Sequence, residues 1–106
     1  MARALITMPR TAKRGEVIEI RALIAHPMES GYRVDSDGRI LPADIIRRFT
    51  VRYAGETVFS AELFPAIASN PYIAFHTLAT ASGTFVFTWE GDKGFTQTES
   101  VELAVA

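Results

Sequence analysis

The feature that most constrains this fold is a strict alternation of apolar and polar residues in short runs. In residues 16–24, isoleucine or alanine occupies every second position from Ile18 to Ile24, and charged residues such as Glu19 and Arg21 stand between them. A period of two places successive side chains on opposite faces of a strand, so one face can be buried while the other meets water. Helical periodicity never extends beyond about two turns. The chain is therefore predicted to be all-β.

Seven such runs are separated by turns that contain glycine or proline. The predicted strands are residues 3–8, 16–24, 45–53, 57–64, 72–79, 84–90 and 95–105. Residues 66–69, between the fourth and fifth predicted strands, are expected to form a single helical turn. Asn70 is expected to be extended because it precedes Pro71. The spacing is typical of an immunoglobulin-like β-sandwich of about seven strands. With 106 residues, the chain is predicted to be a single domain, 1–106.

Most aromatic side chains fall on the inward faces of the predicted strands. These are Phe49, Phe59, Phe75, Phe85, Phe87 and Trp89. Four apolar residues fall instead on outward faces: Leu23, Tyr72, Leu78 and Val86. Either the predicted register is wrong at some of these positions, or a cluster that stays exposed marks a surface for a partner.

Charge and cysteine content exclude several classes of function. The formal net charge is -1 at pH 7, whereas binding to nucleic acid or to an anionic membrane calls for a basic surplus. The chain has no cysteine, which excludes disulfides, thiolate metal sites and a cysteine nucleophile. No apolar run approaches the roughly 20 residues that a membrane span requires, and no secretory signal is expected at the N-terminus.

The connection from residue 26 to residue 44 is longer than a compact sandwich requires. Asp37-Gly38, between Val34 and Ile40, predicts a small hairpin within it. We hypothesise that His26, Met28 and Tyr32 form part of a partner-facing surface, because tyrosine and methionine are enriched at interfaces. In the alternative interpretation, Met28 and Tyr32 pack beneath the loop as a small satellite core, and His26 bonds to the loop backbone.

No catalytic, cofactor or metal site is predicted. An acidic stretch superficially resembles a calcium loop through Asp35, Asp37, Gly38 and Asp44. However, Arg33 would then occupy the first ligand position, and the flanking segments are strands rather than helices. The two histidines, His26 and His76, have no second ligand at a recurrent metal spacing. Ser82 precedes a glycine but lacks the G-x-S-x-G frame of a nucleophilic serine.

Five short segments, taken in order, form a specific set. They are residues 1–6, 13–16, 26–31, 70–72 together with Phe75, and 87–92. With the length of the chain and its lack of cysteine, this set resembles the SoxZ family. SoxZ is the smaller subunit of the SoxYZ sulfur carrier of bacterial thiosulfate oxidation. The resemblance covers essentially the whole chain.

The resemblance implies an immunoglobulin-like subunit that pairs with SoxY as a heterodimer and has no catalytic residue of its own. SoxY bears, on a glycine-rich C-terminal arm, the cysteine to which sulfur intermediates are attached, and pathway enzymes dock transiently to process them. The resemblance also implies a periplasmic location, reached by export with the signal-bearing partner. Two alternatives remain open from the residues alone: a generic sandwich for ligand binding or adhesion, and a small hydrolase that uses His26 with acids from residues 26–44.

Overall fold

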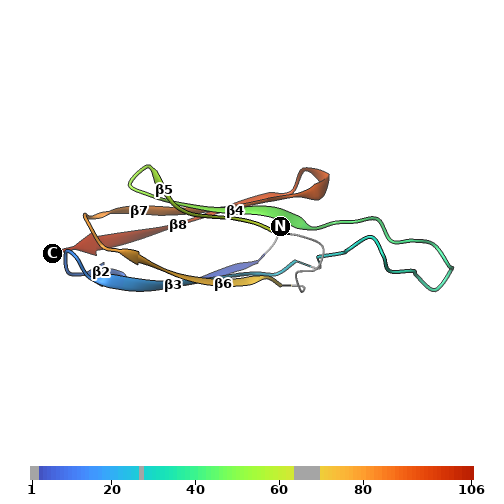
Figure 1. The fold of residues 1–106 in the computed structure, drawn as a ribbon, viewed down its shortest axis with the longest axis horizontal. Helices are drawn as coiled ribbons and strands as arrows, with labels where there is room; N and C mark the ends of the chain where they lie inside the picture. Colours follow the sequence, from blue (N-terminus) through green and yellow to red (C-terminus); the bar gives the residue numbers. More distant parts are fainter. Residues whose placement is uncertain (1–2, 27, 64–69) are drawn as a thin grey trace.

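The computed structural model describes residues 3–26, 28–63 and 70–106 and shows a sandwich of two sheets (Figure 1). One sheet has three strands in the order β1-β3-β6, and the other has five in the order β2-β8-β7-β4-β5. The strands are β1 (Ala4–Thr7), β2 (Thr11–Ala12), β3 (Val17–Ile24), β4 (Ile46–Tyr53), β5 (Glu56–Glu62), β6 (Tyr72–Leu78), β7 (Gly83–Gly91) and β8 (Thr96–Val105). The predicted all-β sandwich is confirmed.

The predicted strands match the observed ones closely, with one addition. The extra strand, β2, has two residues and pairs in parallel with the end of β8; a segment this short has no periodicity to reveal it. The turn between β7 and β8 forms a short 3-10 helix, η1 (Asp92–Gly94). The helical turn predicted at residues 66–69 lies outside the described residues. In the part of the chain that is described, no helix is long and apolar enough to cross a membrane.

The core lies between the two sheets and is built by the side chains that the alternation placed inward. In β3, the even-numbered residues from Ile18 to Ile24 are all buried and the odd-numbered ones are exposed. Phe49 of β4 and Trp89 of β7 are in contact, with ring centroids 5.0 Å apart. Phe59 of β5 stacks on Phe75 of β6 at 4.5 Å, which joins the five-stranded sheet to the three-stranded one. The aromatic core predicted from the sequence is confirmed.

Candidate partner-binding surface

A two-stranded hairpin leaves one end of the sandwich and makes the molecule 58 Å long but only about 20 Å wide (Figure 1). We call residues 28–44 the projecting hairpin. At its base, the backbones of Glu29 and Asp44 exchange hydrogen bonds of 2.8 and 2.7 Å. Towards its tip, Val34 faces Ile40, and Gly38 closes the turn with a φ of 80°. The hairpin predicted around Asp37-Gly38 is confirmed, and it stands outside the sandwich.

His26 and Met28 anchor the base of this hairpin from inside. Both side chains are buried. His26 Nδ1 accepts a hydrogen bond of 3.1 Å from the Met28 N–H, and its ring packs edge-on against Phe95. Met28 Sδ accepts the Ile46 N–H at 3.2 Å. The predicted backbone bond of His26 is thus confirmed, and His26 and Met28 lie beneath the surface that we expected them to form.

Asn70 holds His26 from the other side, in a conformation that we did not predict. Its φ is 54°, in the left-handed region rather than extended. The Asn70 side-chain oxygen accepts the His26 N–H at 3.0 Å, and the Asn70 N–H donates to the His26 carbonyl at 2.7 Å. Asparagine is one of the few residues that adopt this conformation readily, because its short polar side chain can hydrogen-bond locally. These paired bonds outweigh the extended preference before Pro71.

Ion pairs brace the hairpin where it meets the sandwich. Arg47 donates to both carboxylate oxygens of Asp92, and Asp92 also accepts the Ile45 N–H at 3.2 Å. The Arg47 guanidinium, with help from that backbone bond, holds the pKa of Asp92 below its usual range. Within the hairpin, Arg33 lies 2.7 Å from Glu29 and lowers the pKa of that carboxyl in the same way. The hairpin base is therefore fixed at neutral pH by charged hydrogen bonds.

The hairpin presents an apolar face that none of the described residues covers. Tyr32 is 85% exposed, and Val34 and Ile40 are also exposed. Val34 and Ile40 form a directly opposed pair, so their side chains share one face, and Tyr32 is exposed two positions before Val34 in the chain. Of the three predicted surface residues, Tyr32 alone is exposed, and its contact with a partner stays a prediction. Our sequence analysis missed Val34 and Ile40, although their positions flanking the Asp-Gly turn could have revealed the shared face.

The outer face of the three-stranded sheet carries a second exposed apolar group. Leu5 pairs with Leu23, and Leu23 pairs with Tyr72, so the three side chains form a row across β1, β3 and β6. We call these residues the apolar row. The predicted register of β3 and β6 is correct, so Leu23 and Tyr72 do face outward. Of the four apolar residues predicted to face outward, these two are neighbours, whereas Leu78 is exposed at the opposite end of β6 and Val86 is half-buried on the other sheet. The structure adds Leu5 to the row.

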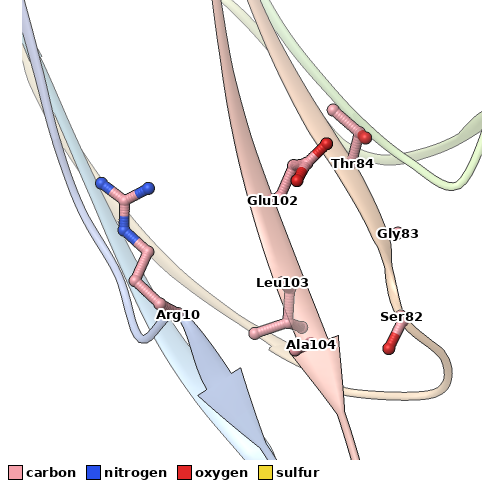
Figure 2. A pocket seen from close by; sticks show the side chains of 7 residues that line it. All are labelled: Arg10, Ser82, Gly83, Thr84, Glu102, Leu103 and Ala104. Atoms are coloured by element: carbon pink, nitrogen blue, oxygen red, sulfur yellow. The ribbon is translucent and has the colours of Figure 1, made fainter.

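Hydrolytic and metal chemistry gain no support from the described residues. An open hollow of about 640 Å³ lies against β7 and β8, lined in part by Arg10, Ser82 and Glu102 (Figure 2). Ser82 Oγ accepts the Val105 N–H at 2.8 Å and so ties the bend before β7 to the end of β8, and neither histidine lines the hollow. His76 is exposed on β6, 3.7 Å from Glu19. Within residues 3–26, 28–63 and 70–106, no group of three His, Cys, Asp or Glu side chains could hold a metal ion.

Solved structures share this fold at low sequence identity. A superoxide reductase (neelaredoxin) from Ignicoccus hospitalis aligns with a TM-score of 0.73 and 15% identity, over 97% of this chain and 80% of that one. The sulfur carrier protein SoxY from Chlorobium limicola f thiosulfatophilum aligns with a TM-score of 0.68 and 13% identity, over 97% of this chain and 78% of that one. At these identities the likeness concerns the fold alone. No curated protein sequence matches the chain.

The sequence comparison identifies the family of this chain more specifically than the shared fold does. It matches the family described as sulphur oxidation protein SoxZ over residues 6–102. The match spans every strand from β2 to β7, the projecting hairpin, half of β1 and most of β8. It covers nearly the whole chain, and it agrees with the resemblance carried by the short segments of the sequence. This chain belongs to the SoxZ family.

Proposed function

We propose that this chain is the non-catalytic subunit of a sulfur carrier heterodimer that serves thiosulfate oxidation. Its partner is a SoxY-type subunit whose cysteine holds the covalent sulfur intermediates. The observation that carries the proposal is the absence of any thiol from a member of a sulfur-oxidation family. Covalent sulfur transfer uses a thiolate as nucleophile. The carrier thiol must therefore be supplied by another chain.

In this proposal the subunit acts as a rigid support rather than as a catalyst. The apolar face of the projecting hairpin, centred on Tyr32, contacts the SoxY-type subunit. Tyrosine suits this role because it buries a large area with few rotatable bonds. The enzymes of the pathway dock transiently on the assembled carrier while the partner's cysteine enters their active sites.

Co-expression tests the pairing. The chain and the SoxY-type subunit of the same genome should co-elute as one heterodimer in size-exclusion chromatography at micromolar concentration. A partner variant with cysteine replaced by serine should co-elute equally well, because the reactive thiol is not needed for assembly. Two separate monomer peaks would contradict the proposal.

The location of the complex is also proposed. We propose that the subunit works in the periplasm and is exported together with its signal-bearing partner. Cell fractionation should find the subunit in the periplasm when the intact partner is present and in the cytoplasm when the partner's signal is deleted. If the subunit is found in the periplasm of cells that lack the partner, this export route is contradicted.

A further inference from the structure

The two outer faces of the sandwich differ sharply in chemistry. On the five-stranded sheet, one row across β5, β4, β7 and β8 consists of hydroxyl residues: Ser60, Thr50, Thr88 and Thr98. The next row brings Arg48 beside Glu62 at 3.5 Å. On the three-stranded sheet, the outward positions nearest the projecting hairpin hold the apolar row. Among the described strands, the exposed large apolar side chains all lie on the three-stranded sheet: Leu5, Val17, Leu23, Tyr72 and Leu78.

The apolar row lies at the end of the sheet from which the projecting hairpin leaves. Leu23 is near the end of β3, immediately before the segment that leads into the hairpin. Tyr72 is the first residue of β6, and Leu5 is near the start of β1. A hollow of about 310 Å³, lined mainly by small and aliphatic residues that include Leu5, Leu23 and Ala25, adjoins the row. The row, the hollow and the hairpin therefore occupy the same end of the molecule.

The apolar row and the apolar face of the hairpin together expose six apolar side chains at one end of the molecule: Leu5, Leu23, Tyr32, Val34, Ile40 and Tyr72. A fully buried tyrosine contributes roughly 150–250 Å², and Tyr32 and Tyr72 are 85% and 57% exposed. Three side chains alone fall short of the roughly 800 Å² per partner that is typical of a stable interface, so a stably bound partner has to contact both groups. Polar groups border the row, including the Arg21–Glu19 ion pair at 2.8 Å, as expected for an apolar centre with a polar rim.

We propose that the apolar row is the docking site for the body of the SoxY-type subunit, and that it forms one interface with the apolar face of the projecting hairpin. This inference rests on the proposed function. A partner with the sandwich fold of the SoxY structure from Chlorobium limicola f thiosulfatophilum can present a sheet face of its own. Two sheet faces pack closely when their side chains interdigitate. In this arrangement the apolar face of the projecting hairpin contacts the partner next to the apolar row.

A matched pair of double variants tests the proposal. Leu5 and Tyr72 in the row are 62% and 57% exposed; Val17 and Leu78, paired across β3 and β6 at the opposite end of the same face, are 62% and 51% exposed. Leu5→Ser with Tyr72→Ser should weaken the affinity for the SoxY-type subunit by about ten- to hundredfold. Val17→Ser with Leu78→Ser should change it less than about threefold. Calorimetric titration gives the affinity, and circular dichroism shows whether each variant is folded.

Hydrogen exchange on the wild-type complex provides a second measurement that needs no variant. Binding should protect the amides of residues 3–8 and 72–75 more than those of residues 76–78 at the opposite end of β6. If the wild type binds but the row variant binds equally well, or protection is absent from the row, the docking site is wrong while the proposed function stands. If the wild type does not bind the partner, the proposed function fails. A homodimer of this chain that the row variant dissociates would assign the row to a second copy and overturn the proposal.

Discussion

Met28 and Tyr32 lie four residues apart in the chain but in opposite environments. Met28 is packed in the core cluster at the hairpin base, whereas the side chain of Tyr32 is largely exposed. Met28→Ala should lower the free energy of unfolding by about 2–5 kcal/mol, because it leaves a cavity. Tyr32→Ala should change it by less than about 0.5 kcal/mol, as is usual at exposed sites. The fluorescence of Trp89, the single tryptophan, reports unfolding in denaturant.

The same two variants separate stability from binding. Tyr32→Ala should weaken the complex with the SoxY-type subunit by about 1–3 kcal/mol, as is common for a central tyrosine at an interface. The folded fraction of Met28→Ala should bind normally. If Tyr32→Ala instead destabilises the isolated subunit and leaves the affinity unchanged, Tyr32 is structural and the apolar face of the hairpin is not a contact surface.

Asp92 gives the hairpin base a dependence on pH. Its pKa is lowered in the folded state, chiefly by Arg47 and also by the Ile45 N–H. A carboxyl with a lowered pKa adds stability above its ordinary value, here 3.8, and loses it as the pH falls through the folded value. Asp92→Asn should therefore lower the melting temperature at pH 7, and the difference should shrink as the pH falls below 3.8. Thermal melts across this range measure it.

Arg47 provides the control for that experiment. Arg47→Gln removes the same ion pair from the other side, so the double variant with Asp92→Asn should be little less stable than either single variant. Fully additive effects, or a difference from wild type that persists at low pH, would show that the ion pair does not fix the hairpin base.

At the scale of elements, the projecting hairpin is separable from the sandwich. Glu29 and Asp44 are already paired at its base, so an Asn-Gly turn can replace residues 30–43 without moving either end. The shortened chain should keep its β-sheet circular dichroism and melt within a few degrees of the wild type, since no exposed hairpin residue belongs to the core. It should lose measurable binding to the SoxY-type subunit. Retained binding would show that the hairpin is dispensable for pairing.

The sequence predicted the strands well because alternation is a local property. The inward faces of β3, β4 and β7 could be assigned residue by residue, since each long strand has one buried face. The candidate surface was harder to predict. Met28 has a φ of 52°, and this turn directs the chain so that its side chain enters the core. The turns at Met28 and Asn70 depend on hydrogen bonds to residues far away in the chain, Ile46 and His26, which the alternation of apolar and polar residues does not identify.

At the scale of the whole molecule, the proposed function predicts that covalent sulfur intermediates are never attached to this subunit. When the complex is incubated with thiosulfate and the pathway enzymes, intact-mass spectra should show sulfur adducts on the SoxY-type subunit and none on this chain, which has no thiol to hold them. Replacing the partner's cysteine with serine should abolish the adducts. A sulfur or thiosulfonate adduct on this chain would contradict its role as a support.

The strand order of the two sheets has a consequence for how the subunit is made. β4 with β5, and β7 with β8, are hairpins closed by short turns, whereas β3 must find β6 from the far part of the chain. Local pairings form faster than distant ones, so we expect the pairings among β4, β5, β7 and β8 to form before β3 meets β6, and the pairing of β2 with β8, which lie at opposite ends of the chain, to form late. The apolar row exists only once β1, β3 and β6 lie side by side. A partner that recognises the row would thereby select finished subunits, and assembly would serve as a check on completed folding.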